Sequence, residues 1–228
     1  MAQAARKRSL PVRIVVLLLK AVFWFVIVTV LWVVLLRFVP PPITATMLMD
    51  EHGATRDWTS MGNIDRSMAV AAIAAEDGNF CLHNGFDFEA IERAWEERQS
   101  GQRQRGGSSI SQQTAKNVFL WQGGGWFRKA LEAYFTVLIE LIWGKNRIME
   151  VYLNVAETGI GTYGVEAGAQ RYFGHGADRL ADIEAAQLAA VLPAPRTRSP
   201  NGGWTARHAG RVAARMRQVR ASPLDDCI

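Results

Sequence analysis

The most constraining feature of this sequence is an apolar run at residues 14–36, IVVLLLKAVFWFVIVTVLWVVLL, in which Lys20 is the only charged residue. A helix of about 20 apolar residues spans the core of a bilayer, and a lysine near its start can extend its ammonium group to the interface. No small-residue cleavage site follows the run, and Pro40-Pro41-Pro42 continues it as a stiff spacer. We therefore expect an uncleaved single-pass anchor rather than a signal peptide.

The charge distribution predicts the orientation of this anchor. All charged residues before Asp50 are basic: Arg6, Lys7, Arg8, Arg13, Lys20 and Arg37. The positive-inside rule then places the N-terminus in the cytoplasm and residues 40–228 outside. Because the remaining chain has 20 basic and 21 acidic residues, the net charge of +5 is an orientation signal. It does not predict a nucleic-acid partner.

The extramembrane sequence predicts a mainly α-helical fold in one domain. Residues 43–64 look irregular, Asp65 can cap a helix that ends near Glu76, and no stretch alternates like a strand. The clearest helix has an apolar stripe at Phe127, Leu131, Phe135, Leu138, Ile139 and Ile142. Outside the cell a disulfide is chemically allowed. We nevertheless expect a buried, reduced Cys81 and a loose tail that carries Cys227.

Residues 74–87, AAEDGNFCLHNGFD, contain the first candidate catalytic group. Desolvation at the end of an apolar helix raises the pKa of a carboxyl group, and the neighbouring Asp77 adds like-charge repulsion. Glu76 is therefore a candidate general base. The alternative is an ordinary surface helix end. We expect His83 to be a structural histidine hydrogen-bonded beside these acids.

The second candidate acid is Glu132, which has Arg128 four residues and Lys129 three residues before it. A surface ion pair in this order stabilises a helix by only tenths of a kcal/mol. The two cations could instead hold the carboxylate ionised and meet a phosphate or pyrophosphate, Arg128 through its bidentate fork.

A polar cluster after Gly106-Gly107 ends at Lys116 and Asn117. Small hydroxyl residues at a helix start leave backbone N–H groups available to an anion. The spacing does not fit a Walker loop. The alternative is a plain polar helix N-terminus.

Taken together, five ordered segments resemble the sequence blocks of glycosyltransferase family 51, the peptidoglycan glycosyltransferases of penicillin-binding proteins. The segments are EDGNFCLHNGFD, GGSSISQQTAKN, RKALE, KNRIMEVYLN and GTYGVEAGAQRYFG. The resemblance covers roughly residues 65–200 and implies a lysozyme-like helical domain. We expect a basic tail (1–13), an anchor (14–36), a linker and juxtamembrane segment (37–64), the catalytic domain (65–220) and a C-terminal tail (221–228). With no S-x-x-K transpeptidase segment after the last block, we expect a monofunctional enzyme.

The resemblance implies polymerisation of lipid II into β-1,4 glycan strands, with inversion and release of undecaprenyl pyrophosphate. Glu76 would be the general base, and Glu132 would organise the donor pyrophosphate, either by holding its neighbouring cations or through a divalent cation such as Mg²⁺ or Mn²⁺. No tightly bound cofactor is expected. Substrate-binding roles are implied for Asp77, Phe80, His83, Gly85, Ser109, Gln113, Lys116, Asn117, Arg128, Lys129, Tyr152 and Asn154.

The expected location is the inner membrane of a Gram-negative cell, with the catalytic domain in the periplasm. The expected partners are lipid II, the growing glycan-lipid chain and membrane lipid, with penicillin-binding proteins or divisome proteins as further candidates. Two alternatives stay open. A two-carboxylate site could cleave glycan, as in lysozyme or a lytic transglycosylase, or the chain could be a non-enzymatic membrane-anchored scaffold of the cell-wall machinery.

Overall fold

The computed structural model describes residues 10–100 and 107–228, which form two units that divide after Val39. The first unit contains α1, Leu10–Phe38, a helix of 29 residues with a mean hydropathy of 2.8 in its most apolar window. Within the described ranges this is the one helix long and apolar enough to cross a membrane. A single-pass anchor is therefore compatible with the structure.

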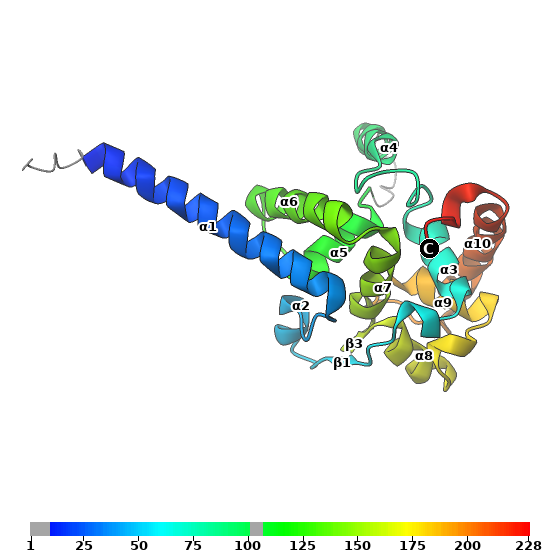
Figure 1. Ribbon diagram of the computed structural model, residues 1–228. Helices are drawn as coiled ribbons and strands as arrows, with labels where there is room; N and C mark the ends of the chain where they lie inside the picture. The colour runs from blue at the N-terminus through cyan, green and yellow to red at the C-terminus, as the bar shows by residue number, and fades with distance from the viewer. Residues whose placement is uncertain (1–9, 101–106) are drawn as a thin grey trace, which may run out of the picture. The chain divides into compact units, whose positions relative to one another are not determined.

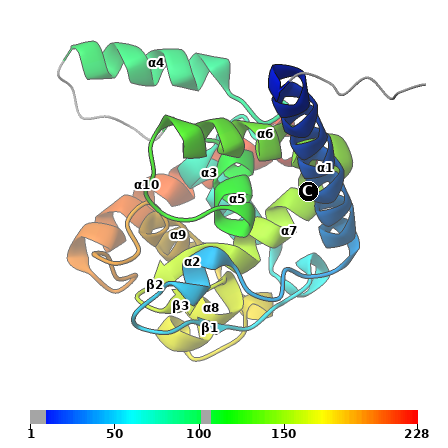
Figure 2. The ribbon, with the colours of Figure 1, turned by 90° about the vertical axis from the view of Figure 1, so that its left-hand side faces the viewer.

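The second unit is helical, with one small sheet (Figures 1 and 2). Its described helices are α2 (Ala45–Leu48), α3 (Arg66–Glu76), α4 (Phe88–Gln99), α5 (Ile110–Phe119), α6 (Trp126–Ile142), α7 (Lys145–Val155), α8 (Val165–Phe173), α9 (Asp182–Val191) and α10 (Gly203–Arg220). Single 3₁₀ turns lie at η1 (Met61–Asn63), η2 (Ala177–Arg179) and η3 (Pro223–Asp225). The mainly α-helical fold class expected from the sequence is confirmed.

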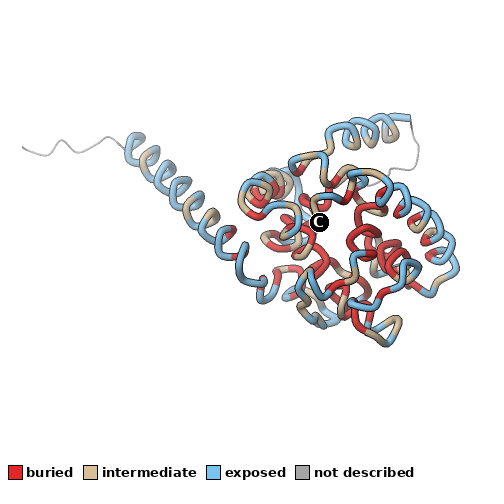
Figure 3. The backbone as a smooth tube through the Cα atoms, turned by 45° about the vertical axis from the view of Figure 1, so that its right-hand side comes forward, coloured by how far each residue is buried: buried red, intermediate tan, exposed pale blue. Residues whose placement is uncertain are grey.

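The core lies around α3, whose residues 67–74 are all buried (Figure 3). One side of this unit packs α3 against α9 and α10, and the other packs α5 against α6 and α7. Alanine-rich stretches in α3 and α9 permit close helix packing because the distance between helix axes depends on the side chains at the contact. The last residue of α3 is Glu76, which therefore directly follows the buried segment of this helix.

A three-stranded sheet corrects the expectation that the chain has no strands. Its strands are β1 (Thr55–Arg56), β2 (Glu157–Gly159) and β3 (Thr162–Tyr163), in the order β1-β3-β2. β1 runs parallel to β3, and β2 runs antiparallel to β3. Strands of two or three residues are too short to show alternation in a sequence. The sheet also includes part of segment 37–64, which packs within the folded unit from Pro40 onward.

The expectation of two reduced cysteines was wrong, because Cys81 and Cys227 form a disulfide. Their Cα atoms lie 5.5 Å apart although the two residues are 146 positions apart in sequence. The C-terminal segment is further held by Arg66, whose guanidinium donates to the Asp225 carboxylate at 3.0 Å. Packing of α10 on α3 brings the two ends together, and no local pattern could have indicated this pairing.

The prediction that Phe127 belongs to the buried apolar stripe of α6 was wrong. The buried face of this helix comprises Glu132, Phe135, Thr136 and Ile139, whereas Phe127 is 73% exposed. Trp126, Val137 and Leu141 are also exposed, and helical spacing puts them on the same side as Phe127. The helix thus has apolar side chains on two sides. One side is buried in the core, and the other is exposed to solvent in this unit.

The disulfide predicts a testable loss of stability. Replacing both cysteines, Cys81→Ser with Cys227→Ser, should lower the free energy of unfolding by about 2–4 kcal/mol, because a cross-link over so long a loop restricts the unfolded chain. The measurement is thermal unfolding of the full chain in detergent. Reduction of the wild-type protein should lower its Tm similarly and leave the double variant unchanged. A Tm that changes neither in the double variant nor on reduction of the wild type would contradict the prediction.

Candidate active site

The loop after α3 is organised by the carboxylate of Asp77. This carboxylate accepts a hydrogen bond from the Nε2 atom of His83 at 2.9 Å and one from the backbone N–H of Ile110 at 2.9 Å. The Nδ1 atom of His83 accepts from the backbone N–H of Gly85 at 3.1 Å, which assigns the ring proton to Nε2. The expectation of a structural histidine beside the acids is confirmed.

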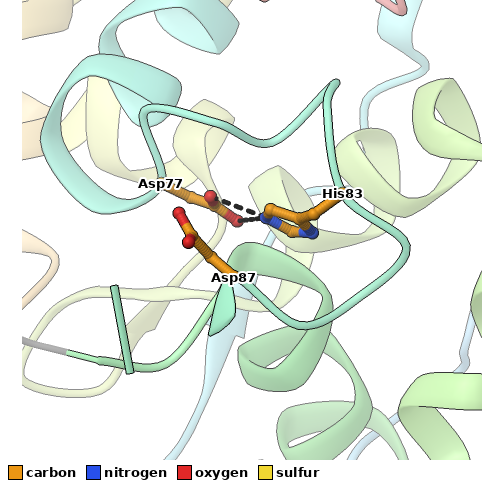
Figure 4. A group of neighbouring side chains, drawn as sticks. All are labelled: Asp77, His83 and Asp87. Atoms are coloured by element: carbon orange, nitrogen blue, oxygen red, sulfur yellow. Dashed lines mark hydrogen bonds and ion pairs between the residues drawn. The ribbon is translucent and has the colours of Figure 1, made fainter. Parts of the chain in front are cut away.

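Asp77, His83 and Asp87 have ligand-type atoms within 4.8 Å of one another (Figure 4). The Asp87 carboxylate accepts from the Asn79 side-chain amide at 3.0 Å and from the Ala90 backbone N–H at 2.8 Å. Protein donors thus already engage all three side chains. Their arrangement fits a hydrogen-bonded cluster that holds the loop in shape, rather than a metal site. We call this cluster of Asp77, His83 and Asp87 the brace.

Gly85 is required where this loop meets α6. Its φ of +91° is strained for residues with a side chain, and a Cβ atom there would lie 2.7 Å from the Thr136 methyl group. The hydroxyl of Ser109 donates to the Gly85 carbonyl, so the loop is tied to the start of α5 as well.

The start of α5 differs from the anion-binding arrangement that the sequence suggested. The Ser109 hydroxyl accepts from the Gln112 backbone N–H at 3.1 Å in a capping box, and the Ile110 N–H is bound to Asp77. The helix start therefore already holds a carboxylate of the protein itself. Of the two alternatives that the sequence left open, the structure thus favours the plain polar helix N-terminus, because the Asp77 carboxylate reaches this position.

Glu76 lies beside this brace and lines a cavity of about 770 Å³. Its Oε2 atom accepts a hydrogen bond from the Gln113 amide at 2.8 Å. Burial raises the pKa of Glu76, and the negative charge of Asp77 raises it further. The Gln113 hydrogen bond and the charges of Arg198 and Lys116 act in the opposite direction. A carboxyl group in this setting can accept a proton near neutral pH.

The second acid, Glu132, is buried on α6, with its side chain only 3% exposed. Its Oε2 atom pairs with Arg128 at 2.7 Å, and its Oε1 atom pairs with Lys129. The surface ion pair considered from the sequence is therefore excluded. The Nε atom of Arg128 is buried and has no hydrogen-bond partner among the described residues, so this guanidinium retains an unused donor.

Lys116 connects the environments of the two acids. Burial lowers the pKa of Lys116, and the charges of Arg128 and Lys129 lower it further, whereas Glu132 and Glu76 raise it. Its ammonium group is thus close enough to sense both carboxylates, and its side chain also lines the 770 Å³ cavity. Glu76 and Lys116 thus line the cavity, and charge interactions of Lys116 connect it to Glu132, Arg128 and Lys129, which are not among the lining residues.

The structure separates the remaining expected site residues into two groups. Gln113, Asn117 and Tyr152 line the cavity. Phe80 and Asn154 are fully buried and perform structural tasks. Lys145 lies 4.5 Å from the centre of the Phe80 ring, and both polar atoms of the Asn154 amide bond the backbone of Thr59 at 2.8 Å.

The cavity lining also includes a charged network that the sequence interpretation missed. Asp50 accepts from the Tyr163 hydroxyl at 2.6 Å and from Arg196 at 2.7 Å, and Arg196 also pairs with Glu157 at 3.0 Å. The hydrogen bonds from Tyr163 and the His52 backbone and the charge of Arg196 lower the pKa of Asp50, whereas burial raises the pKa of Glu157. The four residues come from separate segments, and only Tyr163 lies in one of the sequence blocks.

The strained position of Gly85 gives a prediction about stability. Gly85→Ala should lower the Tm of the full chain by several degrees, because the added methyl group meets Thr136 and the positive φ is unfavourable. Gly78→Ala is the matched control in the same loop, where nothing lies within 4 Å of an added Cβ and φ is ordinary. Equal thermal unfolding of the two variants would refute the assigned constraint.

Comparison with known proteins adds an independent finding. Residues 43–222 match the family model described as Transglycosylase. The chain is 49% identical over 202 residues to a protein of Caulobacter vibrioides named biosynthetic peptidoglycan transglycosylase, covering 86% of this chain and 88% of the relative. Proteins of the same name from Pseudomonas aeruginosa and Xanthomonas axonopodis pv. citri are 48% and 46% identical, covering 78% and 89% of this chain and 81% and 87% of the relatives.

Proposed function

This chain belongs to the transglycosylase family and is a peptidoglycan glycosyltransferase of cell-wall biosynthesis, and we propose that it polymerises lipid II into β-1,4 glycan strands. The donor is the growing strand on its lipid pyrophosphate, and the acceptor is an incoming lipid II molecule. The observation that carries this proposal is the contrast between Glu76, whose pKa is raised by burial, and Glu132, which is surrounded by cations.

Glu76 is the general base in this proposal. Its carboxylate takes the proton from the 4-hydroxyl of the acceptor, and the hydroxyl oxygen forms a bond to C1 of the donor sugar. The bond between C1 and the pyrophosphate oxygen breaks, and undecaprenyl pyrophosphate leaves with the bonding electron pair. Attack from the face opposite the leaving group inverts the configuration at C1. The raised pKa of Glu76 suits proton transfer near neutral pH.

The cations Lys116, Arg128 and Lys129 receive the pyrophosphate. Negative charge develops on the leaving group in the transition state, and positioned cations stabilise it there most strongly. The unpartnered Nε atom of Arg128 offers one donor for this purpose. A divalent cation does not fit this donor set, because both oxygens of Glu132 are already paired with basic side chains. We therefore assign no step to a metal.

A lipid-linked substrate fits the apolar surfaces of the chain. The helix α1 provides an anchor, which we place in the inner membrane with the N-terminus in the cytoplasm and the catalytic unit in the periplasm. On the outer face of α6, Trp126 is 91% exposed, and Phe127 and Leu141 are also exposed. Tryptophan is favoured at membrane interfaces, so this face suits contact with lipid. Penicillin-binding proteins and divisome proteins stay predicted partners.

Glycan cleavage by the same two carboxylates is a weaker alternative. A glycan strand has no pyrophosphate for the cations around Glu132 to bind, and Glu132 itself is paired rather than free to act on a sugar. A purely structural scaffold would need no carboxyl group of raised pKa facing a cavity.

The assignment of the base is tested by Glu76→Gln. Removing the proton acceptor should lower the rate of polymerisation by about 10²–10⁴-fold. The measurement is incorporation of labelled lipid II by the full-length protein in detergent, with products separated by size. Glu89→Gln, an exposed carboxyl group on α4, is the control and should retain full activity. Shortening of preformed glycan by the wild type would instead indicate a lytic enzyme.

Gln113 predicts a shift in the pH profile. Its amide donates to Glu76 and so lowers the pKa of that carboxyl group. Activity requires ionised Glu76 and should rise with pH through its pKa. In Gln113→Ala this acidic limb of kcat/KM should move to higher pH, because the ionised form has lost a donor. Gln122→Ala, which lines the cavity without contacting Glu76, should leave the limb in place. An unshifted limb in Gln113→Ala would argue against Glu76 as the base.

A further inference from the structure

The outward face of α10 carries a basic stripe, which we define as Arg207, Arg211 and Arg215. The three arginines are exposed, and their spacing of four residues places them along one side of the helix. None of them forms an ion pair within the part of the chain that the structure describes. Arg220 on the same helix behaves differently, because it binds both oxygens of Asp182. The basic stripe therefore presents uncompensated positive charge.

A stack of side chains joins the basic stripe to the catalytic cavity. The Arg198 guanidinium lies 4.0 Å from the centre of the Trp204 ring, and Trp204 stacks on His208 with 4.8 Å between ring centres. Arg198 follows directly on residues 192–197, which line the same cavity as Gln113 and Lys116. The chain thus leads without interruption from the cavity wall to α10.

The electrostatic environment agrees with this geometry. Burial lowers the pKa of His208, and the charges of Arg211, Arg198 and Arg215 lower it further. Arg198 also lowers the pKa of Glu76. Arg198 therefore acts on both Glu76 and His208, and Arg211 and Arg215 of the basic stripe act on His208 as well.

We propose that the basic stripe binds the anionic peptide stems of the glycan strand as the strand leaves the cavity. This inference rests on the proposed polymerisation of lipid II. Each disaccharide added to the strand carries a peptide stem with free carboxylates, so negative charge recurs along the product. Guanidinium groups form bidentate hydrogen bonds with carboxylates. The continuity of the basic stripe with the cavity favours the product over a separate anionic surface such as a membrane.

Weak and repeated contacts suit a strand that must slide. An exposed ion pair contributes little by itself and is screened by salt. Several such contacts along one polymer keep its effective concentration near the cavity high after each addition. The basic stripe would thereby lengthen the strand made before the enzyme releases it.

The test compares Arg211→Gln/Arg215→Gln with the matched control Arg179→Gln/Arg217→Gln, which removes two exposed charges outside the basic stripe. Full-length protein in detergent receives lipid II with free stem carboxylates or with amidated stems, and product length is measured. With free carboxylates, the basic-stripe variant should make strands about three- to tenfold shorter, and the control should match the wild type. With amidated stems, the basic-stripe variant and the wild type should make strands of equal length.

A second arm measures binding of purified, uncrosslinked strands at low and high salt. The basic-stripe variant should lose most of the salt-sensitive affinity for strands with free carboxylates. Equal strand affinity in the variant and the wild type would overturn the inference. So would a variant that shortens strands with amidated stems as much as strands with free carboxylates. A variant that loses binding only to phosphatidylglycerol vesicles would also overturn it and assign the stripe to a membrane. A wild type that makes no polymer would refute the proposed function, and strand binding would then decide this inference by itself.

Discussion

The rest of the site depends on the hydrogen bonds that the carboxylate of Asp77 accepts. It joins three elements, because it directly follows α3, accepts a hydrogen bond from His83 in the loop, and accepts another from the first residue of α5. Hydrogen bonds to a charged acceptor contribute about 1.5–3 kcal/mol each. Because Glu76 directly precedes Asp77, the same interactions fix where the end of α3 presents the proposed base.

The two acids differ because their surroundings differ, and each setting has a physical consequence. Glu76 faces a cavity and has an amide as its hydrogen-bond partner, so burial keeps its proton affinity high. Glu132 is buried with two cations, and removing one partner of such a pair typically costs about 3–5 kcal/mol. Buried ion pairs contribute little to net stability, which agrees with the charge-stabilising role proposed for these cations. The charges of both acids raise the pKa of Lys116, so this residue interacts with both.

The sequence supported correct predictions where the signal was local. Helical periodicity predicted a helical domain, and the Asp65 cap marked the start of α3, which ends at Glu76. The order of the five blocks indicated the family. The predictions failed where the deciding contact was distant: the disulfide joins residues 146 positions apart, and the network of Asp50, Glu157 and Arg196 draws on three segments. Phe80 and Asn154 lie in the sequence blocks and are fully buried, and their contact with substrate stays a prediction.

The sequence by itself determined the apolar run and the helical character of the domain, because each depends on residues that are neighbours along the chain. The resemblance of its ordered blocks pointed to the two acids of the proposed site. Only the tertiary structure decided which groups surround those acids. It placed the Asp77 carboxylate at the start of α5, and it set Lys116 where the charges of Glu76 and Glu132 both raise its pKa. Proton affinity and charge stabilisation depend on distance and burial in three dimensions, and residues far apart in sequence supply both.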